Sequence, residues 1–90
     1  MYKKTTVICN KTGLHMRPAT EFIACANKFR SDITIGRATA EERGNAKSVV
    51  MLLKLGLGKG TEIEIVAEGS DEREAVEALT ELIDGGFNDL

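Results

Sequence analysis

The segment Glu62-Ile63-Glu64-Ile65 alternates between acidic and apolar side chains, and the apolar period continues to Ala67. An alternation with a period of two is typical of a β-strand that turns one face to the core and the other to water. A sheet built from such strands has one apolar face, and only this face must be covered by other elements. This pattern therefore predicts an open-faced sheet, with the isoleucines inward and the glutamates in solvent.

Three more strands are expected from short runs of β-branched and apolar residues. The first covers Thr5 to Cys9, although its composition does not indicate which face is buried. The second contains Ile33 and Ile35, which alternate with polar or small neighbours. The polar stretch from Arg37 to Asn45 is expected to hold a turn and a short, weak third strand.

Three helices are expected from the helical spacing of apolar residues and from capping signals. The first runs from about Met16 to Phe29, and the second is a short helix from Ser48 to Leu55. The third follows Ser70, the expected N-cap residue, and ends at Gly85-Gly86. Its apolar stripe consists of Ala75, Val76, Leu79, Leu82 and Ile83.

The resulting order of elements, β-α-β-β-α-β-α, lacks the regular β-α-β alternation of a parallel sheet. We therefore expect an α+β fold, an open-faced β-sandwich in which a four-stranded antiparallel sheet is covered on one face by three helices. With 90 residues the chain has the size of a single domain, from residue 1 to residue 90.

The composition argues against several classes of function. The 12 Lys and Arg residues are dispersed and outnumbered by 14 Asp and Glu, and aromatic residues are rare, which disfavours nucleic-acid binding. One histidine and two cysteines without a Cys-x-x-Cys pair predict neither a metal site nor a disulfide framework, and no cofactor is expected. Cys9 and Cys25 are expected to be buried or half-buried free thiols.

Charge is distributed unevenly along the chain, although the formal net charge is only −2. Residues 1–45 carry eight basic and four acidic side chains, and residues 46–90 carry four basic and ten acidic ones. Such an asymmetry can orient a protein toward a charged partner. The longest apolar runs, Phe22–Ala26 and Val49–Leu53, are too short for a membrane span or a secretory signal. We expect no membrane insertion and a cytoplasmic location.

The segment Gly13-Leu14-His15-Met16-Arg17-Pro18-Ala19 contains the single histidine of the sequence. His15 is expected in a loop directly before a helix, because Pro18 fits the first turn, where its missing N–H loses no intrahelical bond. The N–H groups of a first helical turn attract anions, and the guanidinium of Arg17 presents planar donors that suit phosphate oxygens. An imidazole nucleophile beside an anion site is what a transient phosphohistidine requires.

This segment closely resembles the active-site motif of the HPr family, the phosphocarriers of the bacterial phosphoenolpyruvate-dependent phosphotransferase system. The resemblance covers almost the whole chain and includes Asn45-Ala46-Lys47-Ser48, Leu55-Gly56 with Lys59-Gly60, and Ala67-Glu68-Gly69. The stretch Ser48–Leu53 and the ending Gly86-Phe87-Asn88-Asp89 are similar to the nitrogen-branch paralogue, NPr.

The resemblance implies a stoichiometric phosphoryl carrier and not an enzyme. Enzyme I would pass a phosphoryl group from phosphoenolpyruvate to Nδ1 of His15, and the carrier would pass it on to a histidine of an EIIA-type protein. The helix amides and Arg17 would hold the phosphoryl group, and Pro18 would start the helix. The partner-contacting positions of the family correspond here to Met16, Thr20, Val49, Val50 and Leu53.

The apolar members of this set have to be divided between core and surface. Val49, Leu52 and Leu53 recur at helical spacing, which predicts that at least two of them belong to the core. We expect Met16, Thr20 and Val50 to be exposed and to form the docking surface, since an exposed apolar patch beside a site usually marks an interface.

Ser48 permits two interpretations that are compatible with each other. Serine is a favoured N-cap residue, and the resemblance implies that Ser48 occupies the position at which HPr kinase phosphorylates family members in many bacteria. Relative to the commonest carrier pattern, the sequence has two additional residues between Thr39 and Gly44. We expect this loop to alter how a kinase meets Ser48.

Three functional hypotheses follow. The first is a phosphocarrier, either in sugar uptake or in the nitrogen-regulatory branch, and the sequence does not separate these branches. The second is a regulatory binding module that acts through Ser48, which the presence of His15 disfavours. The third is a histidine phosphatase or mutase, which needs a second acid or base and several basic phosphate ligands, whereas the sequence places only Arg17 and Lys11 near His15. The transported sugar and the oligomeric state stay open.

Overall fold

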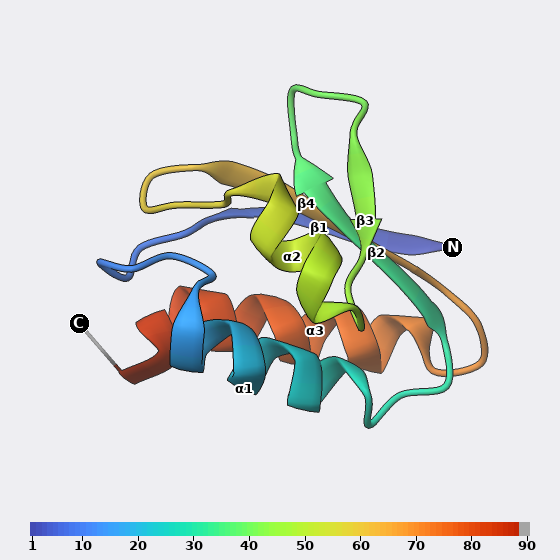
Figure 1. Ribbon diagram of the computed structural model, residues 1–90. Helices are drawn as coiled ribbons and strands as arrows, with labels where there is room; N and C mark the ends of the chain where they lie inside the picture. The colour runs from blue at the N-terminus through green and yellow to red at the C-terminus, as the bar shows by residue number, and fades with distance from the viewer. Residues whose placement is uncertain (89–90) are drawn as a thin grey trace.

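The computed structural model describes residues 1–88, in which a sheet of four strands is combined with three α-helices (Figure 1). In chain order the elements are β1 (Tyr2–Val7), α1 (Met16–Ala26), β2 (Asp32–Arg37), β3 (Arg43–Asn45), α2 (Val49–Leu55), β4 (Glu62–Glu68), α3 (Glu72–Asp84) and the 3₁₀ helix η1 (Gly86–Asn88). This is the expected order of strands and α-helices, with a short additional turn at the end.

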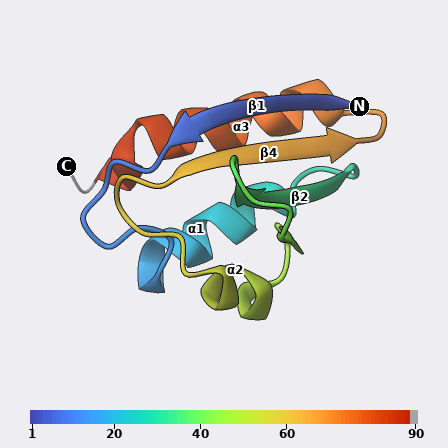
Figure 2. The same ribbon diagram turned by 90° about the horizontal axis from the view of Figure 1, so that it is seen from above.

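The strands pair in the order β1-β4-β2-β3, and each neighbouring pair is antiparallel (Figure 2). The last strand in sequence, β4, therefore lies between β1 and β2. In its register with β2, Ile65 lies opposite Ile35 and Ala67 lies opposite Ile33. These four side chains are buried on the face that is turned to the helices, as the alternation of β4 predicts.

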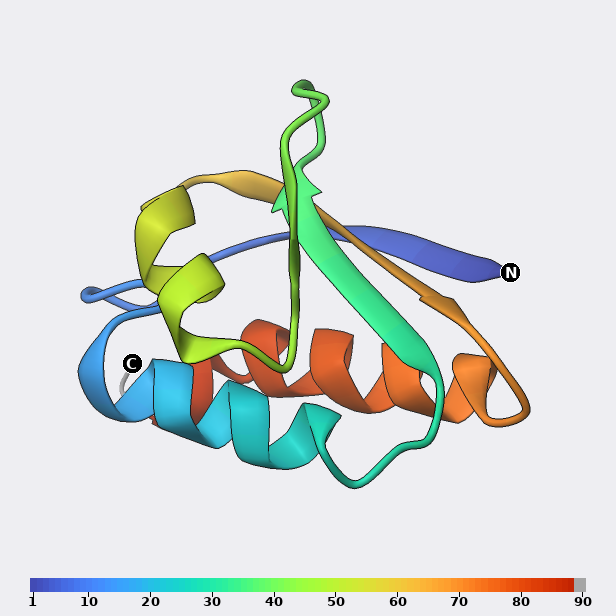
Figure 3. The same ribbon diagram turned by 45° about the vertical axis from the view of Figure 1, so that its right-hand side comes forward.

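All three helices cover this one face of the sheet (Figures 1 and 3). α1 and α3 run antiparallel to each other, and the short α2 lies against α1 and β3. The helices contribute to the core mainly Phe22, Ala26, Leu52, Leu55, Ala75, Val76, Leu79 and Ile83. The expected α+β open-faced sandwich is confirmed. None of the helices within residues 1–88 is long and apolar enough to cross a membrane.

The opposite face of the sheet carries charged side chains. Glu62 is exposed there, as expected, but Glu64 is only half-exposed. Arg43 of β3 reaches across Gly36 of β2, where no side chain intervenes, and forms an ion pair with Glu64. Lys3 of β1 approaches the same carboxylate from the other side, with its Nζ 4.0 Å from Oε2. Glu64 thus lies on the solvent face, as expected, but cations from two neighbouring strands cover part of its side chain.

The first strand begins and ends earlier than the expected segment from Thr5 to Cys9. Its polar start is used by the fold: the hydroxyl of Tyr2 donates to Oε2 of Glu77 at 2.6 Å, and Nζ of Lys4 donates to Oε1 at 2.8 Å. β1 can therefore pair with β4 over its whole length, although its residues toward α3 are polar.

Two helix boundaries also differ from the expectation. α1 ends at Ala26 rather than Phe29, because the N–H groups of Lys28 and Phe29 donate to carbonyls only three residues back, which turns the chain. Asp71, and not Ser70, is the N-cap residue of α3. Its carboxylate does not cap the helix but accepts bonds from the backbone of Arg30 and from the backbone and hydroxyl of Ser31.

Candidate functional site

His15 follows a loop that is braced by the loop between α2 and β4. The N–H of Leu14 donates to the carbonyl of Leu57 at 2.9 Å, and the N–H of Gly60 donates to the carbonyl of Ile8 at 2.7 Å. The side chain of Leu14 is fully buried. The chain that precedes His15 is therefore fixed by backbone bonds to a segment more than forty residues further along the sequence.

Gly13 allows the two loops to approach each other. It has a φ of +64°, and an added Cβ would lie 2.4 Å from the carbonyl oxygen of Leu57 and 2.6 Å from Cα of Gly58. The fully buried Asn10 closes the turn by donating from Nδ2 to the carbonyl of Gly13 at 3.0 Å. Its Oδ1 is buried without a hydrogen-bond partner within residues 1–88. Gly13 and the side chain of Asn10 thus form a tight turn shortly before the histidine.

His15 is the N-cap residue of α1, with a φ of −129° and a ψ of 157°, and its side chain makes no capping hydrogen bond. The residue is half-buried. Pro18 lies in the first turn and is buried, as the motif predicts. The imidazole therefore lies at the positive end of the helix dipole, and it forms no capping hydrogen bond with the N–H groups of α1.

The backbone bends sharply directly after the histidine. Met16 has a φ of +54°, a left-handed conformation that costs a residue with a side chain about 1–2 kcal/mol. The side chain of Met16 is 81% exposed. The start of α1 thus combines a half-buried imidazole with a strained residue whose side chain is exposed.

Arg17 lies next in the first turn, and its side chain is 71% exposed. Its Nε is 3.6 Å from Oε1 of Glu21, one helical turn further along α1. Arg17 thus lies in the first turn of α1, two residues after the N-cap His15, and its guanidinium is accompanied by a carboxylate. Glu21 was not identified from the sequence, although the i,i+4 spacing of an arginine and a glutamate is a signal that could have revealed it.

The five positions expected to contact partners lie on α1 and α2, which pack against each other (Figure 3). Like Met16, Val50 is strongly exposed, at 68%, and Thr20 is also exposed. Val49 and Leu53 are exposed at 48% and 45%. The expectation that two of Val49, Leu52 and Leu53 are core residues is wrong, because only Leu52 is buried. We call Met16, Thr20, Val49, Val50 and Leu53 the apolar patch.

Ser48 is the N-cap residue of α2, and its hydroxyl oxygen accepts a bond from the N–H of Met51 at 3.4 Å. The other end of α2 is closed by Gly56 in a left-handed conformation. Arg37 of β2 donates to the carbonyls of Leu55 and Gly56 at 2.7 and 3.0 Å. This role of Arg37 was not expected from the sequence, since it depends on a contact between a strand and a helix end.

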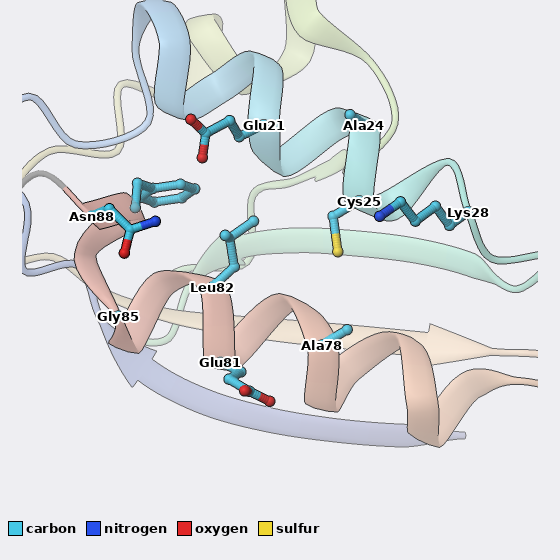
Figure 4. Close-up of a pocket in the computed structure, with 10 residues that line it drawn as sticks. Glu21, Ala24, Cys25, Lys28, Ala78, Glu81, Leu82, Gly85 and Asn88 are labelled. Atoms are coloured by element: carbon cyan, nitrogen blue, oxygen red, sulfur yellow. The ribbon is translucent and has the colours of Figure 1, made fainter.

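A groove of about 590 Å³ lies between α1 and α3, apart from His15 (Figure 4). It is lined by Glu21, Ala24, Cys25, Lys28, Ala78, Glu81, Leu82, Gly85, Phe87 and Asn88. Burial raises the pKa of the Cys25 thiol, which opposes the formation of a thiolate. Cys9 and Cys25 are both half-buried free thiols, as expected. Among the described residues no group of three His, Cys, Asp or Glu side chains is placed to hold a metal ion.

Comparisons with known proteins place this geometry in a family. Residues 2–85 match the sequence model of the family described as "PTS HPr component phosphorylation site". Two curated relatives from Neisseria meningitidis, from strains of serogroups A and B, are both named "Phosphocarrier protein HPr". Each is 40% identical to this chain over 89 residues, which cover 99% of this chain and 98% of the relative.

Solved structures agree with the sequence comparison. The chain is similar to the crystal structure of HPr-C-His from Thermoanaerobacter tengcongensis, with a TM-score of 0.95 and 41% identity over 100% of this chain and 99% of that one. It is also similar to the phosphocarrier protein HPr of Bacillus anthracis, with a TM-score of 0.85 and 39% identity over 91% and 95% of the two chains.

Proposed function

The chain belongs to the HPr family of phosphocarriers of the phosphotransferase system, and from this premise we propose that it takes a phosphoryl group from phosphorylated Enzyme I on His15 and delivers it to an EIIA-type protein. The observation that carries this proposal is the place of His15. Its imidazole stands at the N-terminus of α1, half-exposed and without a capping bond. Residues 1–90 would act as one domain in the cytoplasm.

The transfer needs only an imidazole lone pair at His15. Nδ1 of the neutral ring attacks the phosphorus atom of a phosphohistidine on Enzyme I, so that one P–N bond forms while the other breaks. The phosphoryl group then leaves His15 in the same manner for a histidine of the EIIA-type protein. His15 itself accepts and then donates the group, one phosphoryl group per chain in each cycle, so the chain would act as a stoichiometric carrier between two partner proteins. Phosphoenolpyruvate, through Enzyme I, is the source of the group.

The first turn of α1 supplies the stabilisation of the phosphoryl group. Its backbone N–H groups and the helix dipole favour a dianion at the N-terminus. Arg17 adds one or two charge-assisted hydrogen bonds, each worth roughly 1.5–3 kcal/mol. A single guanidinium together with amides is a moderate anion site, which suits a group that must be passed on.

Arg17→Ala is expected to slow phosphoryl transfer tens- to hundredfold and to leave the melting temperature almost unchanged, because the side chain is largely exposed. The measurement compares single-turnover transfer from phosphorylated Enzyme I with thermal unfolding of the same samples. A strongly lowered melting temperature with an unaffected transfer rate would assign Arg17 to the fold instead.

The apolar patch beside His15 would be the docking surface for both partners. Four of the six exposed large hydrophobic residues within residues 1–88 belong to it: Met16, Val49, Val50 and Leu53. Concentrated exposure of apolar side chains next to a site is typical of an interface. Enzyme I and the EIIA-type protein would bind this surface in turn, since each must reach the same imidazole.

A second, regulatory function is favoured by the position of Ser48. The residue caps α2 immediately before Val49 and Val50, so a phosphate on its hydroxyl would lie at the edge of the apolar patch. HPr kinase is the enzyme class that would place it there. The nitrogen-regulatory branch is the other regulatory setting, and an EIIA-type gene of either branch beside the gene of this chain would separate the two.

The proposal is tested by incubating the protein with Enzyme I and phosphoenolpyruvate. We expect the intact mass to increase by one phosphoryl group, in an acid-labile and base-stable linkage. His15→Ala is expected to remain unmodified while it keeps the unfolding transition of the wild type. Uptake of phosphate by His15→Ala would show that another residue is the acceptor and would overturn the assignment.

A further inference from the structure

We propose that Glu21 is a positioning residue for the phosphoryl group: it holds the guanidinium of Arg17 along α1 in the unphosphorylated protein and gives it up when His15 is phosphorylated. The inference rests on the proposed function of His15 and Arg17. It adds a residue that sets how firmly the phosphoryl group is held, and hence how readily it is passed on.

Along α1, Arg17 lies between His15, which would carry the phosphoryl group, and the carboxylate of Glu21. His15 precedes Arg17 by two residues at the start of α1, and Glu21 follows it by one helical turn. The rise of a helical turn is about 5.4 Å, and Nε of Arg17 is 3.6 Å from Oε1 of Glu21. The ion pair therefore draws the guanidinium along the helix, away from the end at which the phosphoryl group would sit.

The carboxylate of Glu21 lies at the surface, where it can pair with the guanidinium of Arg17 and can also release it. The side chain of Glu21 is 37% exposed and lies on the rim of the groove between α1 and α3. Figure 4 shows it at the end of the groove that also holds Asn88. Glu21 is thus part of the surface of α1 next to the site, without being buried in the core.

Competition between the two anions has a thermodynamic consequence. A phosphoryl group carries about −1.5 to −2 charges at neutral pH, against −1 for the carboxylate, so it attracts the guanidinium more strongly. Whatever stability the Glu21 ion pair gives to the unphosphorylated protein is lost on phosphorylation, which lowers the equilibrium content of phosphohistidine. Exposed i,i+4 ion pairs are weak, so removal of Glu21 should raise this content about two- to threefold.

The test measures an equilibrium, because an equilibrium constant does not depend on how fast partners dock. A catalytic amount of Enzyme I is added with a large excess of pyruvate over phosphoenolpyruvate, so that both forms of the carrier are populated. The ratio of phosphorylated to unphosphorylated protein is read by intact mass. We expect Glu21→Gln to raise this ratio about two- to threefold over the wild type.

Two further variants separate positioning from a general effect of charge. Glu81→Gln removes a carboxylate from the facing wall of the same groove and should leave the ratio unchanged. In an Arg17→Ala background, Glu21→Gln should also leave it unchanged, because no guanidinium remains to be competed for. An unchanged ratio in Glu21→Gln alone would overturn the inference. An equal rise in Glu81→Gln, or in the Arg17→Ala background, would do so too, since it would indicate direct repulsion.

The same samples distinguish failure of this inference from failure of the proposed function. If the wild type takes up no phosphoryl group, or takes it up at a residue other than His15, the carrier function fails and the role of Glu21 fails with it. If the wild type is phosphorylated on His15 and Glu21→Gln has the same equilibrium ratio, only the role of Glu21 is wrong.

Discussion

At the scale of single residues, the site depends on a contact that only a glycine can make. The carbonyl of Leu57 and Cα of Gly58 occupy the space in which a side chain at position 13 would lie. The same carbonyl accepts the bond from Leu14, directly before His15. A displacement at Gly13 is therefore transmitted to the imidazole through two residues of backbone.

Gly13→Ala is expected to destabilise the protein by about 2 kcal/mol or more, from a strained φ together with a backbone clash, and to lower the melting temperature by roughly 10 °C. It should also slow phosphorylation of His15. Gly60→Ala is the matched control: Gly60 has a φ of +88°, but an added Cβ meets no atom within 4 Å. Equal losses in the two variants would show that the clash with Leu57 contributes nothing.

The sequence predicts those residues of the site whose role follows from their own chemistry. A lone imidazole, a nearby guanidinium and a proline at a helix start indicate an anion site from type and spacing alone, and their placement is as expected. The roles of Asn10 and Arg37 depend on which carbonyl lies beside them after folding. Neither residue could be found by motif, because an asparagine in a turn and an arginine in a strand are ordinary.

At the scale of elements, α2 shows how a helix of two turns presents a surface. One side buries Leu52 and Leu55, and the other leaves Val49, Val50 and Leu53 exposed. From the sequence we expected more of the residues of α2 to be buried, because apolar residues occupy most of its positions. A helix that packs from one side only has room for a narrow buried stripe, so its remaining apolar residues must face outward.

Val50→Asp is expected to slow phosphorylation of His15 by Enzyme I about tenfold or more, because docking on the proposed surface would bury the added charge, while the core is not touched. Its unfolding transition should resemble that of the wild type. Val7→Asp is the control: Val7 is a valine of β1 that is exposed at 48% but lies outside the apolar patch. If both variants transfer at the wild-type rate, the apolar patch is not the docking surface.

Ser48→Asp is expected to lower the rate of His15 phosphorylation and to leave the melting temperature nearly unchanged. Aspartate is a good N-cap residue, so α2 tolerates the charge. The resemblance to the HPr family implies an acidic docking face on Enzyme I, and such a face would be repelled by the added charge. The deficit should shrink with added salt, since exposed charges are screened beyond about 8–10 Å at 0.10–0.15 M. Ser48→Asn, a neutral cap of the same shape, should transfer normally. A normal rate for Ser48→Asp at low salt would leave Ser48 as a helix cap only.

At the scale of the whole molecule, Glu77 connects the two ends of the chain. Its carboxylate accepts bonds from Lys4 and Tyr2 of β1, and Arg73 lies over the Tyr2 ring at 5.9 Å from its centroid. Hydrogen bonding from Lys4, followed by that from Tyr2, lowers the pKa of Glu77 below its usual 4.5. The charged form of Glu77 is therefore favoured in the folded state over the unfolded one.

The sign of the pH dependence follows from this shift. The contribution of Glu77 to stability is fully present above pH 4.5 and is lost as the pH falls through the lower pKa of the folded state, because the unfolded state binds the proton first. Glu77→Gln should therefore show a smaller loss of unfolding free energy between about pH 6 and pH 3 than the wild type. The control is Glu74→Gln, at an exposed glutamate on the same helix. Identical acid profiles in Glu77→Gln and the wild type would contradict this role.

Much of the architecture could be predicted because β4 and the helical stripes carry their pattern in adjacent residues. The alternation around Ile63 and Ile65 specified a one-sided sheet, and the stripe of α3 specified its cover. The early start of β1 does not follow from the sequence, because Tyr2 and Lys4 are polar and their partners, the backbone of β4 and the carboxylate of Glu77, are distant in sequence. The same holds for the cap of α3, where Asp71 is engaged by a loop forty residues away in sequence.

The position of β4 between β1 and β2 has a consequence for folding during synthesis. β1 and β2 do not pair with each other: β1 pairs only with β4, and β2 pairs with β3 and with β4, the strand that is synthesised last. The nascent chain must therefore leave the ribosome almost entirely before its sheet can close, and the loop that braces His15 emerges at the same late moment. A polypeptide released before residue 62 would contain the histidine, the arginine and the proline, yet only β2 and β3 could pair in it and the four-stranded sheet could not form. Because the loop before β4 braces the chain that precedes His15, we expect a chain that ends before β4 to lack the geometry of the site.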